Sequence, residues 1–104
     1  MPISQAEWTP EAENDLEEIL LHLVLEKQSP LIADRMATEI SQACDSYSES
    51  FAKGHVLGTA QPNFGKGYRI FRVKAWIIIF RPIDHGIEVM RIFHGSQDYP
   101  RLFR

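Results

Sequence analysis

Three side chains in the second half of the chain have the types needed for phosphate chemistry. Cleavage of RNA without a metal requires a base for the 2′-hydroxyl, cations that stabilise the phosphorane and an acid for the leaving oxygen. Arg69 and Arg91 could serve as the cations, and His94 is of the residue type used most often for proton transfer. Tyr99 could be the acid if the C-terminal tail folds back. Arg69, Arg91 and His94 are therefore the catalytic candidates.

The spacing of Arg91 and His94 argues against a shared cleft. The two are an odd number of positions apart, so a regular strand places them on opposite faces of its sheet unless a bulge intervenes. His94 is followed by Gly95, and its imidazole could hydrogen-bond the turn there as a structural group. A structural and a catalytic role for this histidine are both open, and the structural role is the commoner one.

Basic and aromatic side chains are concentrated in the same half of the chain. Residues 53–104 hold nine Lys and Arg against three acids, whereas residues 1–52 hold two against eleven, so the local net charges are +6 and −9. Interleaved arginines and aromatic rings can bind nucleic acid, but they can also form a solvated sheet face or dock an acidic protein segment. The candidates for partner binding in this half are Arg72, Trp76, Arg81, Tyr99, Arg101 and Phe103.

Length and composition indicate one small domain, residues 1–104. With 44% hydrophobic residues the chain can bury a modest core. No apolar run approaches the ~18 residues of a membrane span, and the first residues lack the pattern of a secretory signal. The single cysteine, Cys44, fits a small buried side chain rather than a disulfide or a metal cluster. We expect a cytoplasmic protein with no membrane contact, no metal and no cofactor.

The first half of the chain predicts a short strand and two helices. The strand is expected at residues 3–8, the first helix from Pro10 to about Glu26, and the second from Pro30 to about Gly54. Thr9-Pro10 and Ser29-Pro30 each combine a capping residue with a proline suited to the first helical position. The short link between the helices makes them an antiparallel hairpin.

An apolar stripe on the first helix recurs at steps of three and four, and Asp15 is expected to lie off it. Leu21, Val24 and Leu25 lie partly off the same stripe. They could form an exposed patch for a partner protein or a second copy, or they could widen the face that covers the core. The members of the stripe are Ala12, Leu16, Ile19, Leu20 and Leu23.

The second half predicts an antiparallel meander of three strands. Residues 54–67 read as an irregular loop rich in glycine. Strands are expected at 68–73, 76–81 and 87–93, and the continuous apolar run of the middle one suggests a central strand covered on both faces. The tail, 95–104, could fold back onto the sheet. The order strand, helix, helix, strand, strand, strand predicts an α+β two-layer domain with the hairpin packed on the sheet.

Several short motifs follow one another over nearly the whole chain. They are Trp8-Thr9-Pro10-Glu11-Ala12 with Asp15-Leu16 and Ile19, Ser29-Pro30 with Ala33, Gly67-Tyr68-Arg69, the strand Trp76 to Arg81, and the ending Val89 to Gly95 with Asp98. In this order they resemble the RelE/ParE superfamily of toxins from bacterial type II toxin–antitoxin modules, and within it the ParE (plasmid stabilisation) branch.

The resemblance implies a helical hairpin on a twisted antiparallel sheet, and a cognate antitoxin whose C-terminal arm wraps the toxin. Such an arm could add a strand to a free sheet edge. RelE-like members are metal-free, ribosome-dependent ribonucleases, whereas ParE-like members inhibit DNA gyrase and lack the nuclease residues. A related branch has adjacent His and Tyr near the C-terminus, and this pair is missing here because Gly95 follows His94.

Three functions remain open from the sequence. The favoured one is a ParE-like toxin that inhibits DNA gyrase by binding and has no catalysis of its own. The second is a RelE-like mRNA endoribonuclease that uses Arg69, Arg91 and His94. The third is a family member that has lost toxicity and acts as an antitoxin-binding partner or corepressor.

Overall fold

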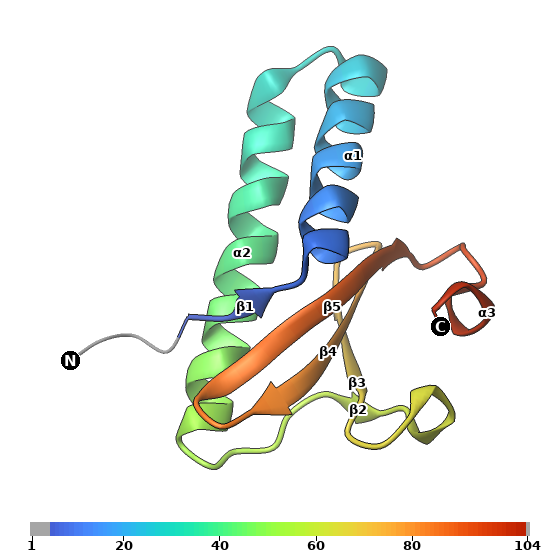
Figure 1. Ribbon diagram of the computed structural model, residues 1–104. Helices are drawn as coiled ribbons and strands as arrows, with labels where there is room; N and C mark the ends of the chain where they lie inside the picture. Colours follow the sequence, from blue (N-terminus) through green and yellow to red (C-terminus); the bar gives the residue numbers. More distant parts are fainter. Residues whose placement is uncertain (1–4, 104) are drawn as a thin grey trace.

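A helical hairpin and a five-stranded sheet form two layers (Figure 1). The computed structural model describes residues 5–103. The elements are β1 (Glu7–Trp8), α1 (Pro10–Lys27), α2 (Pro30–Ala52), β2 (Thr59–Ala60), the 3₁₀ turn η1 (Pro62–Phe64), β3 (Arg69–Val73), β4 (Trp76–Ile83), β5 (Gly86–His94) and α3 (Tyr99–Leu102). This is the α+β order that the sequence predicts, with short additional elements.

The sheet has the strand order β1-β5-β4-β3-β2. Its centre is the expected antiparallel meander of β3, β4 and β5. β1 pairs in parallel with β5, so the sheet is mixed, and β2 pairs antiparallel with β3 inside the loop expected to be irregular. The expected strand at residues 3–8 is present only at Glu7–Trp8, and residues 3 and 4 lie outside the described part.

β4 is the central strand, covered on both faces as its apolar run predicts. Ile77, Ile78, Ile79 and Phe80 are each at most 1% exposed. Ile78 and Phe80 belong to the core beneath the helices, whereas Ile77 and Ile79 belong to a second core on the opposite face. Alternation along one strand therefore supplies two separate apolar clusters.

Apolar side chains of α1 and α2 fill the core beneath the helices, and on α1 they include Ala12 and Ile19 of the expected stripe. Ala12, Ile40 and Cys44 are completely buried. Tyr47 stacks on Phe71 of β3 with ring centroids 3.9 Å apart. Thr9 caps α1 as expected, because its side-chain oxygen accepts a hydrogen bond from the amide of Ala12 at 3.0 Å.

The C-terminal tail covers the opposite face of the sheet. The ring of Phe103 lies 5.0 Å from that of Phe64 in η1 and 5.3 Å from that of Tyr68. Tyr99 makes an edge contact with Phe64 at 6.3 Å. In Figure 1, α3 accordingly lies across the sheet from the hairpin.

The hairpin projects beyond the sheet, and its distal half has little to cover (Figure 1). Ile19 is the last residue of α1 that is buried. Leu21 and Leu25 are 61% and 69% exposed, and Leu31 at the start of α2 is 58% exposed. The two leucines of α1 therefore form an exposed patch and do not widen the core-facing stripe. None of the helices within residues 5–103 combines the length and apolar character needed to cross a bilayer.

Candidate functional site

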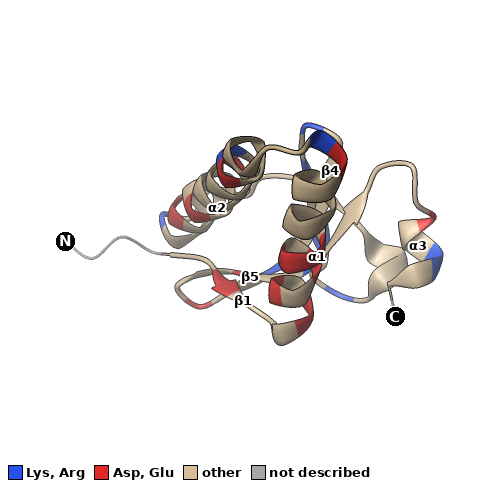
Figure 2. Ribbon diagram, turned by 90° about the horizontal axis from the view of Figure 1, so that it is seen from above, with Lys and Arg blue, Asp and Glu red and all other residues tan. Residues whose placement is uncertain are grey.

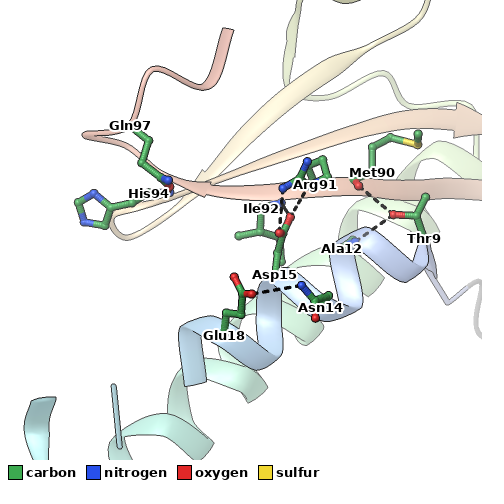
Figure 3. Close-up of polar contacts among 10 residues, drawn as sticks. All are labelled: Thr9, Ala12, Asn14, Asp15, Glu18, Met90, Arg91, Ile92, His94 and Gln97. Atoms are coloured by element: carbon green, nitrogen blue, oxygen red, sulfur yellow. Dashed lines mark hydrogen bonds and ion pairs between the residues drawn. The ribbon is translucent and has the colours of Figure 1, made fainter. Parts of the chain in front are cut away.

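Arg91 is held by a carboxylate on the neighbouring helix (Figure 3). Its Nε donates to Oδ2 of Asp15 at 2.7 Å, and its Nη2 donates to Oδ1 at 3.0 Å. Asp15 is only 8% exposed, and its Oδ2 also accepts the amide of Ile92 at 2.9 Å. The hydrogen bonds to Asp15 raise the pKa of Arg91 above its ordinary value. This guanidinium therefore joins α1 to β5.

Arg69 is engaged with the loop that precedes it. Its Nε donates to the carbonyl of Leu57 and its Nη2 to the carbonyl of Gly58, both at 2.8 Å. Gly58 has a φ of +80°, and a Cβ there would lie 2.7 Å from the carbonyl oxygen of Ile70. Glycine at this position lets the loop come close enough to β3 for Arg69 to hold it.

His94 contacts the turn that follows it. Its Nδ1 accepts the amide of Ser96 at 3.1 Å and lies 2.6 Å from the Ser96 hydroxyl. Because a main-chain N–H donates to Nδ1, the proton of the neutral ring is on Nε2. Trp76 meets the imidazole edge-on with ring centroids 5.0 Å apart. These are the turn contacts expected of a structural histidine.

The three catalytic candidates lie in three different places. Arg69 pairs with Phe80 and His94 with Trp76 along β4, which separates them by about 13 Å of strand. Arg91 pairs with Ile79, whose side chain belongs to the core on the face of the sheet away from the hairpin. Tyr99, the candidate acid, packs against Phe64.

A hollow of about 350 Å³ opens between α1 and the end of β5. We call it the α1–β5 hollow. Apolar side chains from α1, β4 and β5 form its walls, and its lining contains carboxylates but no lysine or arginine. The lining residues are Asp15, Glu18, Ile19, His22, Trp76, Ile92, Phe93, His94 and Gln97.

The candidates for partner binding divide among three surfaces. Two candidates, Leu21 and Leu25, lie on the hairpin, and Trp76 lines the α1–β5 hollow. The others lie on the face of the sheet away from the hairpin or on the tail that covers it: Arg72, Arg81, Tyr99, Arg101 and Phe103. Arg81 forms an ion pair with Glu88 at 2.8 Å. Tyr99 and Phe103 are largely committed to the core on that face.

Comparison with known proteins decides the family. The family model described as "ParE toxin of type II toxin-antitoxin system, parDE" matches residues 6–99. The chain belongs to the ParE toxin family. A solved structure described as "Chromosomal ParDE TA system from P. aeruginosa" matches with a TM-score of 0.70 and 21% identity, covering 88% of this chain and 96% of that one. At that identity the likeness supports the fold. No curated protein sequence matches the chain.

The outer edge of β5 in this ParE family member is capped by side chains beyond the two residues of β1. The Thr9 hydroxyl donates to the carbonyl of Met90 at 2.8 Å. Asp15 accepts the amide of Ile92, and Gln97 Oε1 accepts the amide of His94 at 2.7 Å. A strand added by a partner would have to displace these contacts, so this edge is not the free one that strand addition requires.

The prediction that Asp15 lies off the apolar stripe of α1 is wrong. The residue lies on the buried face of α1. Its spacing indicates this place, because a residue three positions after Ala12 and four before Ile19 lies on the same face of the helix as both. A carboxylate on that face requires a buried partner, and Arg91 supplies it.

Two further side chains of α2, Cys44 and Ser48, are buried in the folded protein. Burial raises the pKa of the Cys44 thiol to about 12, with a smaller contribution from the charge of Asp45, so Cys44 is the small buried side chain expected. Ser48, completely buried on α2, accepts the amide of Ile87 at 3.1 Å. Residues 5–103 contain no group of three His, Cys, Asp or Glu side chains arranged to hold a metal ion.

Proposed function

We propose that this chain is a growth-inhibiting toxin that acts by binding DNA gyrase, has no catalysis of its own, and is neutralised by a cognate antitoxin. Family membership supports the toxin role. Gyrase comes from the resemblance to the ParE branch. The antitoxin comes from the same resemblance and from the solved relative, whose description names a ParDE toxin–antitoxin system.

The observation that supports binding without catalysis is that both candidate arginines already have hydrogen-bond partners within the protein. Arg91 forms the two-pronged ion pair with Asp15, and Arg69 donates to two carbonyls of its own loop. Stabilisation of a phosphorane requires cations aimed at one point where charge develops. Arg69, Arg91 and His94 do not converge on such a point, and each has a structural partner.

The charge pattern supports different roles for the two layers. Figure 2 shows most of the acidic residues on α1 and α2. Arg72 and Arg81 belong to the face of the sheet away from the hairpin, where an acidic segment of the antitoxin would be attracted. That segment could add a strand more easily at the β2–β3 edge of the sheet than at the β5 edge, because side chains cap the outer edge of β5.

Two assays with purified protein separate the mechanisms. We expect the chain to inhibit supercoiling by DNA gyrase and to leave mRNA on programmed ribosomes intact. Arg69→Lys is a useful variant, because it keeps a cation but cannot donate to both loop carbonyls in the same way. Ribosome-dependent mRNA cleavage without gyrase inhibition would overturn the proposal. So would loss of growth arrest in both Arg69→Ala and Arg91→Ala variants that remain folded, combined with retained gyrase inhibition.

A further inference from the structure

The α1–β5 hollow has two carboxylates in its lining, and only one of them, Asp15, forms an ion pair within the described part of the chain. Asp15 is paired with Arg91, and His22 with Glu26 at 2.8 Å. Within residues 5–103, Glu18 forms no ion pair, and its hydrogen bond is a long one from Asn14 at 3.4 Å (Figure 3). Arg91 interacts with Glu18 only at longer range. The Glu18 carboxylate is therefore the group that a ligand cation can reach.

The walls of the hollow suit the stem of a long basic side chain. Trp76 lines the hollow together with the nearly buried Ile19 and Ile92, so an aliphatic stem would meet an apolar wall there. The volume of about 350 Å³ is at the lower end for small-ligand sites, which fits one side chain better than a cofactor. The Nε2–H of His94 is a donor for a main-chain carbonyl of the same ligand.

The surface beside the hollow suits a helix. Leu21 follows Glu18 by three positions and Leu25 follows His22 by three, so both leucines adjoin residues of the hollow on the exposed side of α1. Two exposed leucines spaced by four residues are a contact that amphipathic helices use. The patch is too small for an interface of its own and would form the anchor of a larger one.

Charge selects the occupant of this surface. α1 contains six acidic residues and one lysine. A second copy placed on it would set acidic faces against each other, which is unfavourable. A partner helix with basic residues would be attracted, and one of its side chains could pair with Glu18 while its apolar residues cover Leu21 and Leu25.

We propose that the α1–β5 hollow binds an arginine or lysine side chain from an amphipathic, basic helix of a partner protein, which packs along Leu21 and Leu25. This partner contact is separate from the basic face of the sheet. It requires neither gyrase as the target nor inhibition of growth.

The first test uses a capped single residue as the probe. Nα-acetyl-arginine methylamide is titrated into the ¹⁵N-labelled chain, and the capped citrulline analogue, which lacks the charge, serves as the control. We expect saturable shifts at the Trp76 indole and the Ile92 amide, with Trp8 unaffected, and binding at least about fivefold weaker for citrulline. Glu18→Gln should remove the preference for arginine, and the neighbouring Glu17→Gln should keep it. Equal binding of both probes, or an unchanged preference in Glu18→Gln, would overturn the proposal.

The second test addresses the helix. A synthetic helical peptide of about 15 residues, with one arginine and leucines spaced to meet Leu21 and Leu25, should bind at least about tenfold more tightly than the capped arginine. The double variant Leu21→Ser, Leu25→Ser should lose that gain and still bind the capped residue. Full binding by the double variant would reject the helix. Sedimentation of the free chain should show a monomer, and a dimer abolished by Glu18→Gln would assign the hollow to a second copy and overturn the proposal.

Discussion

Asp15 joins α1 to β5 through its two carboxylate oxygen atoms. It accepts two hydrogen bonds from the Arg91 guanidinium and one from the amide of Ile92, from the second turn of α1. Removing one partner of a buried pair leaves the other charge poorly solvated, which costs more than the pair itself contributes. The contact therefore matters most for the position of α1 on β5.

Asp15→Asn should lower the free energy of unfolding by about 2 kcal/mol. The expected loss is below the range for fully buried pairs because the side chain of Arg91 is 31% exposed. Urea denaturation followed by circular dichroism measures it. Glu17→Gln is the matched control on the same helix and should change stability by less than about 0.5 kcal/mol. Additive losses in the double variant Asp15→Asn, Arg91→Gln would show that the two residues are not coupled.

Cys44 should resist modification in the folded protein. Its thiol is completely buried and its pKa is raised to about 12, so almost no thiolate exists at mildly alkaline pH. Ellman's reagent should react slowly with the native chain and at once in concentrated guanidinium chloride. Rapid reaction of the native chain would mean that the cysteine is accessible.

The same raised pKa makes stability depend on pH in the alkaline range. The unfolded chain loses the thiol proton above its ordinary pKa of 9.0, whereas the folded chain keeps it until about 12. The free energy of unfolding should therefore fall as the pH rises through this interval, by up to ~1.4 kcal/mol per unit. Cys44→Ala should show a shallower fall, and equal slopes for the two proteins would contradict the assignment.

At the scale of elements, the segment before α1 organises both a helix and a strand edge. Thr9 caps α1 through Ala12 and donates its hydroxyl proton to Met90, and its own amide donates to Val89 at 3.0 Å. One threonine thus aligns the start of α1 with β5 at the end of the short β1.

Thr9→Ala should cost about 1–2 kcal/mol of stability, because it removes the cap and the hydroxyl contact to β5 together. Thr9→Ser keeps the oxygen and should retain most of the stability. Thermal unfolding of the three proteins compares them. A serine variant as unstable as the alanine variant would assign the effect to the lost methyl group.

The elements were predictable wherever one local signal was sufficient. Cap-plus-proline pairs marked both helices, and the run Trp76 to Phe80 marked the central strand. The spacing of Asp15 from Ala12 and Ile19 was sufficient to place it on the buried face of α1, but its partner was not predictable, because Arg91 lies 76 positions away. The α1–β5 hollow was missed for a related reason, since α1, β4, β5 and the turn after β5 form it jointly.

The whole molecule consists of a well-packed base and a projecting hairpin. Buried residues are dense in β4 and β5, and α1 has none beyond Ile19. Local stability follows the burial of apolar contacts, so the two regions should open with different free energies.

Hydrogen exchange should resolve this difference. We expect the amides of residues 22–32 to exchange much faster than those of Ile77 to Phe80, whose opening approaches global unfolding. Amide exchange measured by NMR gives both regions in one experiment. Equal protection in the distal hairpin and in β4 would mean that contacts between the helices alone hold the tip, or that another molecule covers it.

The projecting hairpin also affects how the molecule moves through solvent. The chain has principal extents of 41 × 37 × 22 Å for a mass of 12.0 kDa, so it is far from spherical. A flattened particle experiences more friction than a sphere of equal mass and leaves a gel-filtration column early. An elution volume judged against globular standards would therefore overstate its mass, and light scattering is the measurement to trust when its assemblies with other proteins are counted.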